Sequence, residues 1–535
     1  MDFAALIFFL TLYYVRPQEW FTAFNKFHPV QLLSVVAIWG LMKAQKIKFK
    51  VLVQTPLDWM MLTYFGWTLI AGLQPRESFS EIQSVVLFYF VGVCSLDSIP
   101  RLKKFLGWWC LFTFFIAALA VASKYGFDPL GGNSATEGMM KGRLILNLSV
   151  FNNPNALAHS VIPAVPLFYY LFYWRRTAAK AGLLLLGIPL YCIFLTQSKG
   201  AFVSGFATVL ATLTFGRSKF VQILILVLAI SFGYGALYKL PRMSELNHAQ
   251  SDPAIEGRIA ALTFGLSLMR ANYLGIGLGN FEEVFFKRGP LEKIRVPRMF
   301  HFGLMGVRKK FIEVAIHYVK ATHCAYNQNG AELGYFGLFL FVGLLYCCVR
   351  TLLLVKSVDD DEERIRRTLF AMVVAYAVSS WMVDFCYRPT FFLMVAAISA
   401  FHRHLLREQT ASESGKDVVK VAPVSGRPGI GRFPPVSIPG IPLPGLPAPM
   451  AAQSAGCIGT EIAPPALPSP LPHSFPNSRP ALVNRSAANW SGKRNLDEVL
   501  RKKFIWNKLG ILDFVIMLAL TDAAIHYWEH LIATM

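Results

Sequence analysis

The sequence is short of acidic residues and lacks the cysteine and glycine patterns of several common sites. Its 535 residues include 31 Asp and Glu against 52 Lys and Arg, a formal net charge of +21. The eight cysteines form no C-x-x-C pair and no alternating Cys/His pattern, which argues against a zinc site and a disulfide scaffold. No glycine-rich loop continues into the Lys-Ser or Lys-Thr of a P-loop, so an ATP-driven pump is not expected.

Apolar residues dominate what is present, with 54% hydrophobic and 14% aromatic residues. Repeated apolar runs approach the roughly 20 residues that span a bilayer. The first run, residues 3–15, lacks a basic leader and a small-residue cleavage site, so we expect a retained span. We predict an all-α polytopic membrane protein with about 12 transmembrane helices. The predicted spans are residues 1–15, 29–42, 57–73, 81–96, 105–123, 153–174, 181–196, 200–215, 219–239, 323–349, 368–386 and 389–406.

Basic residues mark alternate loops between the predicted spans, as at residues 43–50, 101–104 and 364–367. The positive-inside rule places these loops, and both ends of the twelve-span core, in the cytoplasm. The positive charge is therefore interpreted as a marker of membrane orientation, and no nucleic-acid partner is expected. On this orientation the loop of residues 240–322, between nine spans in 1–239 and three in 323–406, faces outward.

The composition changes after Arg407 to Pro, Gly, Ser and Ala. Residues 407–498 are predicted to be a disordered or polyproline cytoplasmic linker, because such a segment cannot build a packed core. Within residues 499–535, a short apolar run meets Asp522, His526 and Glu529. This C-terminal segment fits a thirteenth span and an interfacial helix equally well.

The outward loop has 83 residues and carries twelve Lys and Arg against seven Asp and Glu. A connection of that length is usually a functional element with its own structure. Apolar residues recur at helical spacing in residues 256–270 and 304–320, so we predict a large helical loop. Its basic excess fits attraction of an anionic substrate or lipid headgroup, and equally a solvated polar face. Between the two helices, residues 275–281 are glycine-rich and predict a tight turn that re-aims the chain.

A helix predicted to begin at His323 follows this loop directly. On that helix Gly330 and Gly334 form a small-xxx-small pair, which predicts close packing against another helix. Glu332 falls on the opposite side from His323, so we do not expect both to contact one reactant. A lone histidine at a helix start also fits a cap or a headgroup contact. The residues predicted to share one face are His323, Tyr326, Gly330, Gly334 and Gly337.

The segment His323-Cys-Ala-Tyr326, followed by Glu332-Leu-Gly334-Tyr-Phe-Gly337, resembles the mark of the O-antigen ligase and polymerase family of bacterial envelope glycosyltransferases. The resemblance covers residues 1–406. This chain has Cys324 where the family usually has Asn, and Lys199 where it has Arg; lysine keeps the charge but loses the bidentate fork. Three further stretches agree in order, namely Phe151-Asn-Asn-Pro-Asn155-Ala-Leu-Ala158, Thr196-Gln-Ser198-Lys199-Gly200, and Gly257-Arg258 leading to Gly275-Ile-Gly277-Leu-Gly279-Asn-Phe281.

The resemblance implies a GT-C-like fold in the bacterial inner membrane, with the active site facing the periplasm and no metal or cofactor. It implies transfer of a glycan from an undecaprenyl-pyrophosphate-linked donor to an acceptor hydroxyl. The acceptor can be lipid A-core, as in lipopolysaccharide biosynthesis, a growing polysaccharide or a protein. Membrane lipids, the lipid-linked donor and a lipid or glycan acceptor are thus the expected partners.

In this reading His323 is the catalytic base for the acceptor hydroxyl. Arg258 and Lys199 are the expected cations for the pyrophosphate, although Arg258 fits a helix-surface arginine as well. Tyr326, Asn155 and Arg388 are further candidate substrate-binding residues. Tyr326 also fits a packing or orienting role, and Asn155 fits a broken helix start before the sixth span.

A multi-pass transporter or a flippase of lipid-linked oligosaccharides is the main alternative, because twelve spans with inward termini also describe many carriers. Charged residues inside the predicted spans are few, with Glu332 and Asp384 the best candidates, and no repeat relates the two halves. A non-catalytic assembly partner, whose proline-rich tail recruits cytosolic proteins, is compatible with either function.

Overall fold

The computed structural model describes residues 2–21, 24, 26–47, 52–129, 142–172, 180–237, 253–288, 294–301, 307–314, 322–355, 359–419, 506 and 508–534. The first elements are α1 (Asp2–Tyr14), α2 (Pro17–Trp20), α4 (Pro29–Lys43), α6 (Pro56–Ile70), η1 (Ala71–Leu73), α7 (Pro75–Ser95) and α8 (Ile99–Lys124). Next come α10 (Pro154–Val161), α11 (Ala164–Phe172), η2 (Ala181–Leu186), α13 (Gly187–Leu195), α14 (Lys199–Thr214) and α15 (Lys219–Leu237). The last are α16 (Pro253–Ala271), α17 (Phe281–Arg288), β1 (Ile294–His301), β2 (Val307–Val314), α18 (Ala325–Leu354), α19 (Asp360–Ser379), α20 (Pro389–Val419) and α22 (Ile511–Thr534).

The chain divides into two compact units. The first joins Met1–Ala411 to Leu500–Met535, and the second is Ser412–Val499. Within the second unit the structure describes only residues 412–419, at the end of α20. Residues 407–419 of the predicted linker at residues 407–498 belong to helix α20, and the rest of it lies outside the described residues. The features below belong to the first unit.

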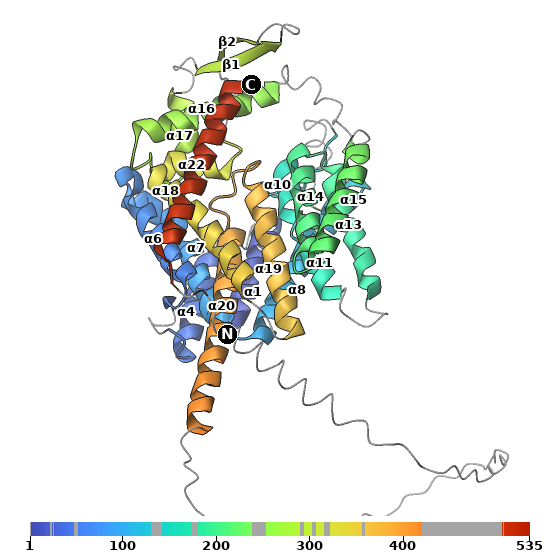
Figure 1. Cartoon of the computed structure of the whole chain (residues 1–535), viewed down its shortest axis with the longest axis vertical. Helices are drawn as coiled ribbons and strands as arrows, with labels where there is room; N and C mark the ends of the chain where they lie inside the picture. Colours follow the sequence, from blue (N-terminus) through green and yellow to red (C-terminus); the bar gives the residue numbers. More distant parts are fainter. Residues whose placement is uncertain are drawn as a thin grey trace, which may run out of the picture. The chain divides into compact units, whose positions relative to one another are not determined.

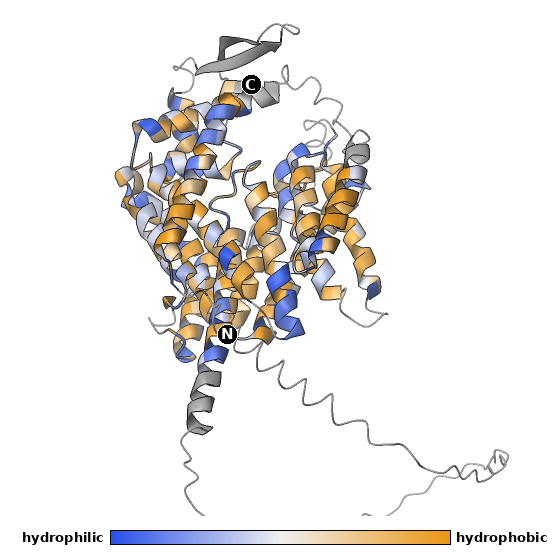
Figure 2. Ribbon diagram, viewed as in Figure 1, coloured by the Kyte–Doolittle hydropathy of each residue, from blue (hydrophilic) through white to orange (hydrophobic). Residues whose placement is uncertain are grey.

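Apolar helices give the described chain the character of a membrane protein (Figure 2). All twelve predicted spans coincide with helical segments, but many of these are short. The 13 residues of α1 extend about 20 Å, against a hydrocarbon core of about 30 Å. Within the part of the chain that the structure describes, 6 helical segments are long and apolar enough to cross a membrane, namely Pro75–Ser95, Ile99–Lys124, Pro154–Phe172, Ala325–Leu354, Pro389–Thr410 and Ile511–Ala533.

A buried polar network joins α6, α7 and α20 in the core. One carboxylate oxygen of Asp58 accepts from the backbone N–H and the hydroxyl of Thr55, at 2.9 and 2.8 Å. The other oxygen accepts from the Tyr89 hydroxyl at 3.1 Å and lies 3.4 Å from the Arg403 guanidinium. Asp58 and Arg403 are 0% and 2% exposed. A buried charge is costly unless it is paired and hydrogen-bonded, so this network holds the three helices in one arrangement.

Helix α18 is broken at Gly334, where the backbone has φ 72 and ψ −175. In an unbroken helix the carbonyls of residues 331–333 would accept from the N–H groups four residues on. Here the Ala331 carbonyl accepts from the Ile276 N–H at 3.2 Å, and the Glu332 carbonyl from the Gly277 N–H at 2.9 Å. The third carbonyl, of Leu333, accepts from the indole N–H of Trp67 at 2.7 Å. The predicted turn at residues 275–281 is thus confirmed, and it docks onto the break.

The same turn joins α16 and α17, which pack beside the start of α18 (Figure 1). The predicted helix at residues 256–270 is confirmed by α16, whose residues Ile259, Leu266 and Met269 are buried. Gly330 of α18 has its predicted packing role, since a Cβ there would come within 2.3 Å of the Met269 sulfur.

The predicted helix at residues 304–320 is wrong, and the outer loop is therefore not all helical. Residues Val307–Val314 form strand β2, paired antiparallel with β1 so that Val296 lies opposite Ile312. The helical spacing of apolar residues was outweighed by pairing with β1, which ends six residues before β2 begins, and by β-branched residues, which favour a pleated strand. A single segment's periodicity cannot show such a partner.

Helix α22 lies along α18 with opposite chain direction, and Figure 1 shows the two side by side. Near its first turn Asp513 pairs with Arg350 and accepts a hydrogen bond from the Tyr346 hydroxyl at 2.7 Å. Near its last turns Trp528 packs against Trp381, with 5.8 Å between ring centroids. Since Trp381 also packs on the first turn of α18, α22 reaches both ends of that helix. Its contacts therefore favour the thirteenth-span interpretation over an interfacial helix.

The replacement Gly334→Ala is expected to destabilise the protein strongly. The backbone at Gly334 lies in a region that is essentially restricted to glycine, and a Cβ would come within 2.1 Å of the Tyr273 carbonyl oxygen. We expect a loss of about 3 kcal/mol or more in the free energy of unfolding. Thermal unfolding in detergent measures it, with Gly66→Ala as the control, because a Cβ at Gly66 meets nothing within 4 Å. Equal melting temperatures for the two variants would contradict the account of the break.

The two ends of α22 are expected on opposite sides of the membrane. Lys508 and His530 are exposed near these ends, and each can be replaced by cysteine with Cys457→Ala as the background. A membrane-impermeant maleimide applied to intact cells stripped of their outer membrane should label His530→Cys and leave Lys508→Cys unlabelled. Permeabilised cells should show both labelled. Labelling of both positions from one side would contradict a thirteenth span and favour an interfacial helix.

Candidate functional site

His323 lies two residues before α18, in a strained corner of the chain. Its backbone is left-handed, with φ 51. The N–H of Ala325, two residues after His323, donates to the carbonyls of Ser380 and Val383 at 2.7 and 3.0 Å. A non-glycine residue persists in this conformation only where its surroundings hold it, and such residues cluster at functional sites. The link between α19 and α20 therefore fixes the histidine.

The single helical face predicted for His323 and the glycines is wrong. The helix begins at Ala325, with Cys324 as its N-cap, and it breaks at Gly334. The prediction from residue spacing requires one continuous helix. The segment is instead divided into a corner at His323, a short helical part before Gly334 and a longer one after it.

A cavity of about 680 Å³ opens beside His323 and brings it together with Arg258. Arg258 comes from α16 and His323 from the start of α18, so docking of the two helices creates the site. The walls are mostly apolar, and α22 supplies a large part of them. The lining residues are Arg258, Ile259, Leu262, Thr322, His323, Cys324, Trp381, Met382, Leu520, Ala523, Ala524, Tyr527, Trp528 and Leu531.

The surroundings of His323 favour its neutral form. Burial lowers the pKa of the imidazole below its ordinary value of 6.5, and the positive charge of Arg258 lowers it further. The carboxylate of Asp384 acts in the opposite direction. The net result is an imidazole that is neutral at pH 7 and able to accept a proton.

Asn155 links two of the sequence stretches on which the family resemblance was based. Its side-chain oxygen accepts from Arg143 at 2.9 Å and from the Ser198 hydroxyl at 2.7 Å. Asn153 caps α10 and accepts from the Asn155 N–H at 2.8 Å, which confirms the predicted helix start. These bonds show a connecting role for Asn155, and it is not among the cavity-lining residues.

Lys199 is the first residue of α14, next to the cavity wall rather than in it. A Cβ on the adjacent Gly200 would come within 2.8 Å of Met382, and Met382 lines the cavity. Thus the structure brings the Lys199 segment against the same wall as His323 and Arg258, while Lys199 itself is not a lining residue.

Tyr326 and Arg388, two further candidates, have contacts elsewhere. Tyr326 is 6% exposed and donates its hydroxyl to the Ala377 carbonyl at 3.0 Å. The Arg388 guanidinium lies over the ring of Phe385, 5.2 Å from its centroid. Neither lines the cavity. The contacts of Tyr326 match its alternative packing role.

Glu332 is fully buried and belongs to the turn rather than to the cavity. Its side chain accepts from the backbone N–H of Phe281 and from the amide of Gln328, each at 3.2 Å. The expectation that Glu332 and His323 do not contact one reactant agrees with this placement. The hydrogen bond from the Phe281 N–H to the Glu332 carboxylate therefore helps to hold the turn at residues 275–281 on α18.

Sequence reasoning missed the part that α22 plays in the cavity. The stripe from Leu520 to Leu531 lies beyond the proline-rich segment and outside the stretch that resembles the family. Its helical spacing, with small residues at Ala523 and Ala524, was the available signal. Periodicity shows that such a stripe is buried but cannot identify the surface that it contacts.

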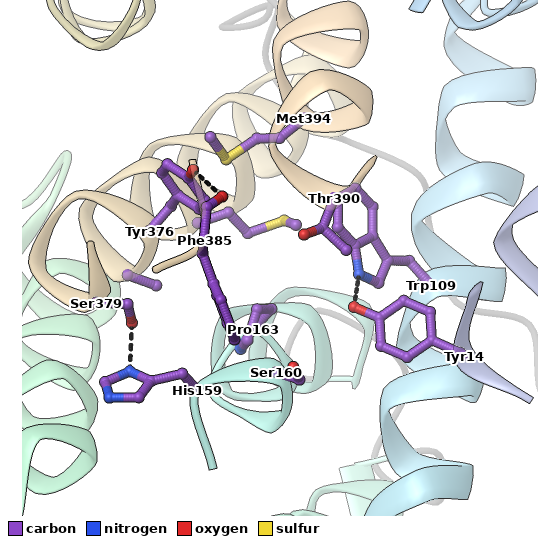
Figure 3. Close-up of a pocket in the computed structure, with 12 residues that line it drawn as sticks. Tyr14, Trp109, His159, Ser160, Pro163, Tyr376, Ser379, Phe385, Thr390 and Met394 are labelled. Carbon is purple, nitrogen blue, oxygen red and sulfur yellow. Dashed lines mark hydrogen bonds between the residues drawn. The ribbon is translucent and has the colours of Figure 1, made fainter. Parts of the chain in front are cut away.

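A second cavity, of about 30 Å³, lies among α1, α8, α10, α19 and α20 (Figure 3). There Nδ1 of His159 and the Ser379 hydroxyl are hydrogen-bonded at 2.7 Å, and Ser204 lies 2.7 Å from the same hydroxyl. A space of that size admits water but not a sugar. His159 is therefore interpreted as part of the core.

Comparison with known proteins gives no family for this chain: no protein-family model and no curated protein matches it.

Proposed function

We propose that this protein transfers a glycan from an undecaprenyl-pyrophosphate-linked donor to an acceptor hydroxyl at the periplasmic face of the bacterial inner membrane. One observation carries the proposal: an imidazole and a guanidinium from separate segments line one cavity of about 680 Å³ with mostly apolar walls. Such a cavity suits an amphipathic lipid with an anionic head. The sequence resemblance supplies the glycan and the carrier.

The reaction is a single displacement. Nε2 or Nδ1 of neutral His323 takes the proton of the acceptor hydroxyl as its oxygen bonds to the anomeric carbon. The bond between that carbon and the pyrophosphate oxygen breaks, and undecaprenyl pyrophosphate leaves with the electron pair. Arg258 stabilises the negative charge that develops on the leaving group. Because this group is already a stable anion, no general acid is required, and the anomeric centre is inverted.

The remaining candidates act around this pair. Lys199, beside the wall formed by Met382, adds positive potential for the pyrophosphate. Asn155 accepts a hydrogen bond from Ser198 and so positions the residue that directly precedes Lys199. We therefore assign Asn155 and Tyr326 to positioning, with His323 as the base and Arg258 as the main phosphate ligand. Both acceptor classes, lipid A-core for a ligase and growing polysaccharide for a polymerase, fit this chemistry.

His323→Ala in the native host should lower surface glycan at least ~100-fold, since removal of a general base costs about 10²–10⁴ in rate. Lipid-linked glycan should accumulate, because the donor is still made. Gel analysis of surface glycan and extraction of the lipid fraction measure the two quantities.

The matched control for that variant is His28→Ala. His28 also has left-handed backbone before a helix, with φ 45, and it does not line the cavity. It should keep normal surface glycan. Normal glycan in His323→Ala would overturn the mechanism, and redistribution of a labelled lipid-linked sugar across liposomes without product would favour the flippase.

The midpoint on the acidic side of the pH profile of kcat/KM should shift in opposite directions when each of the two charges near His323 is removed. The active imidazole is neutral, so kcat/KM rises with pH through its pKa, which lies below 6.5. Asp384→Asn removes a charge that favours the protonated ring, and the midpoint should move to lower pH. Arg258→Gln removes an opposing charge, and the midpoint should move to higher pH even though the rate falls. Midpoints that stay fixed, or that move together, would contradict this assignment.

A further inference from the structure

Helix α22 presents a continuous stripe to the cavity that holds His323 and Arg258. The stripe repeats every three or four residues over three turns, and its central positions are small. Large apolar or aromatic side chains stand at either end. Its members are Leu520, Ala523, Ala524, Tyr527, Trp528 and Leu531.

This helix is held in place by contacts that do not involve the cavity. Asp513 is 2% exposed and pairs with Arg350 of α18. Met517 packs at Gly343, where a Cβ would lie 2.9 Å from the Met517 sulfur. Toward the other end, Glu529 pairs with Arg270 of α16. Anchors along its length make α22 a fixed wall, so the width of the cavity depends on its side chains.

The small residues leave the space that the cavity occupies. Ala523 is exposed to this space, whereas Trp528 is 1% exposed and packs on Trp381. The lining also includes Ile259 and Leu262 of α16, which are apolar as well. A sugar needs polar groups around it, whereas apolar walls such as these gain van der Waals contacts by packing against a hydrocarbon chain.

We infer that α22 forms the binding wall for the polyprenyl chain of the lipid carrier. The phosphate of the carrier then lies beside Arg258 and His323. The inference rests on the proposed function for the identity of the lipid. The binding itself is a property of the walls and does not require turnover. A chain lying against Ala523 and Ala524 occupies the same cavity that Arg258 and His323 line, where its anionic head group can meet the guanidinium.

Undecaprenyl phosphate binding to the purified full-length protein in detergent tests the inference. Ala523→Trp places an indole in the cavity and should weaken binding by about tenfold or more, because the ring occupies volume that the chain needs. Leu518→Trp is the matched control: Leu518 is on the same helix, 58% exposed, and does not line the cavity. It should bind as the unchanged protein does. Equal melting temperatures for both variants show that α22 stays docked.

Comparison of two lipids that share a head group but differ in chain length distinguishes binding by the α22 wall from binding of the head group. Farnesyl phosphate has the same head and a short chain, so it should bind more weakly than undecaprenyl phosphate to the unchanged protein. Ala523→Trp should reduce that preference. Undecaprenyl phosphate binding that Ala523→Trp leaves intact, or that inorganic phosphate displaces as well as farnesyl phosphate does, would overturn the inference. Failure of the proposed function gives another result, namely normal surface glycan in His323→Ala with the binding pattern retained.

Discussion

The site depends on one interruption in a membrane helix. Gly334 breaks α18 and frees three consecutive carbonyls, which would be costly to leave unpaired in an apolar environment. The turn at residues 275–281 and the indole of Trp67 satisfy them. That turn follows α16 directly, so the bonds that repair the break also hold α16 against the start of α18. Arg258 lies beside His323 because of this docking.

Two further constraints shape the chemistry proposed for the cavity. The corner at His323 is held by the Ser380 and Val383 carbonyls, and burial together with the charge of Arg258 lowers the pKa of its imidazole. Under the proposed function, the apolar lining would contact the carrier chain and Arg258 would contact its anionic head group. Preorganised charge in a poorly solvated cavity stabilises a leaving anion far more than the same charge does in water.

The sequence allowed the helical, membrane-associated character, the α16 stripe and the glycine turn to be predicted, because each follows from local composition or periodicity. It also identified His323 and Arg258, and the structure places both in one cavity. Three features were missed for a common reason. The three are the β1–β2 pairing, the break that removes His323 and Gly334 from one face, and the contact of α22 with the cavity. Each depends on a partner outside the segment whose periodicity was considered. Asn155 was placed among ligands because an isolated motif does not show that its side chain bonds Arg143 and Ser198.

The central claim is that one displacement, assisted by His323 and Arg258, moves the glycan off its lipid carrier. The stereochemistry of the product tests it most directly. Purified protein in liposomes, supplied with lipid-linked glycan and acceptor, should release one undecaprenyl pyrophosphate for each glycan transferred. NMR of the new linkage should show an anomeric configuration opposite to that of the donor. Retention of configuration, or transport of the donor without release of the carrier, would contradict the account.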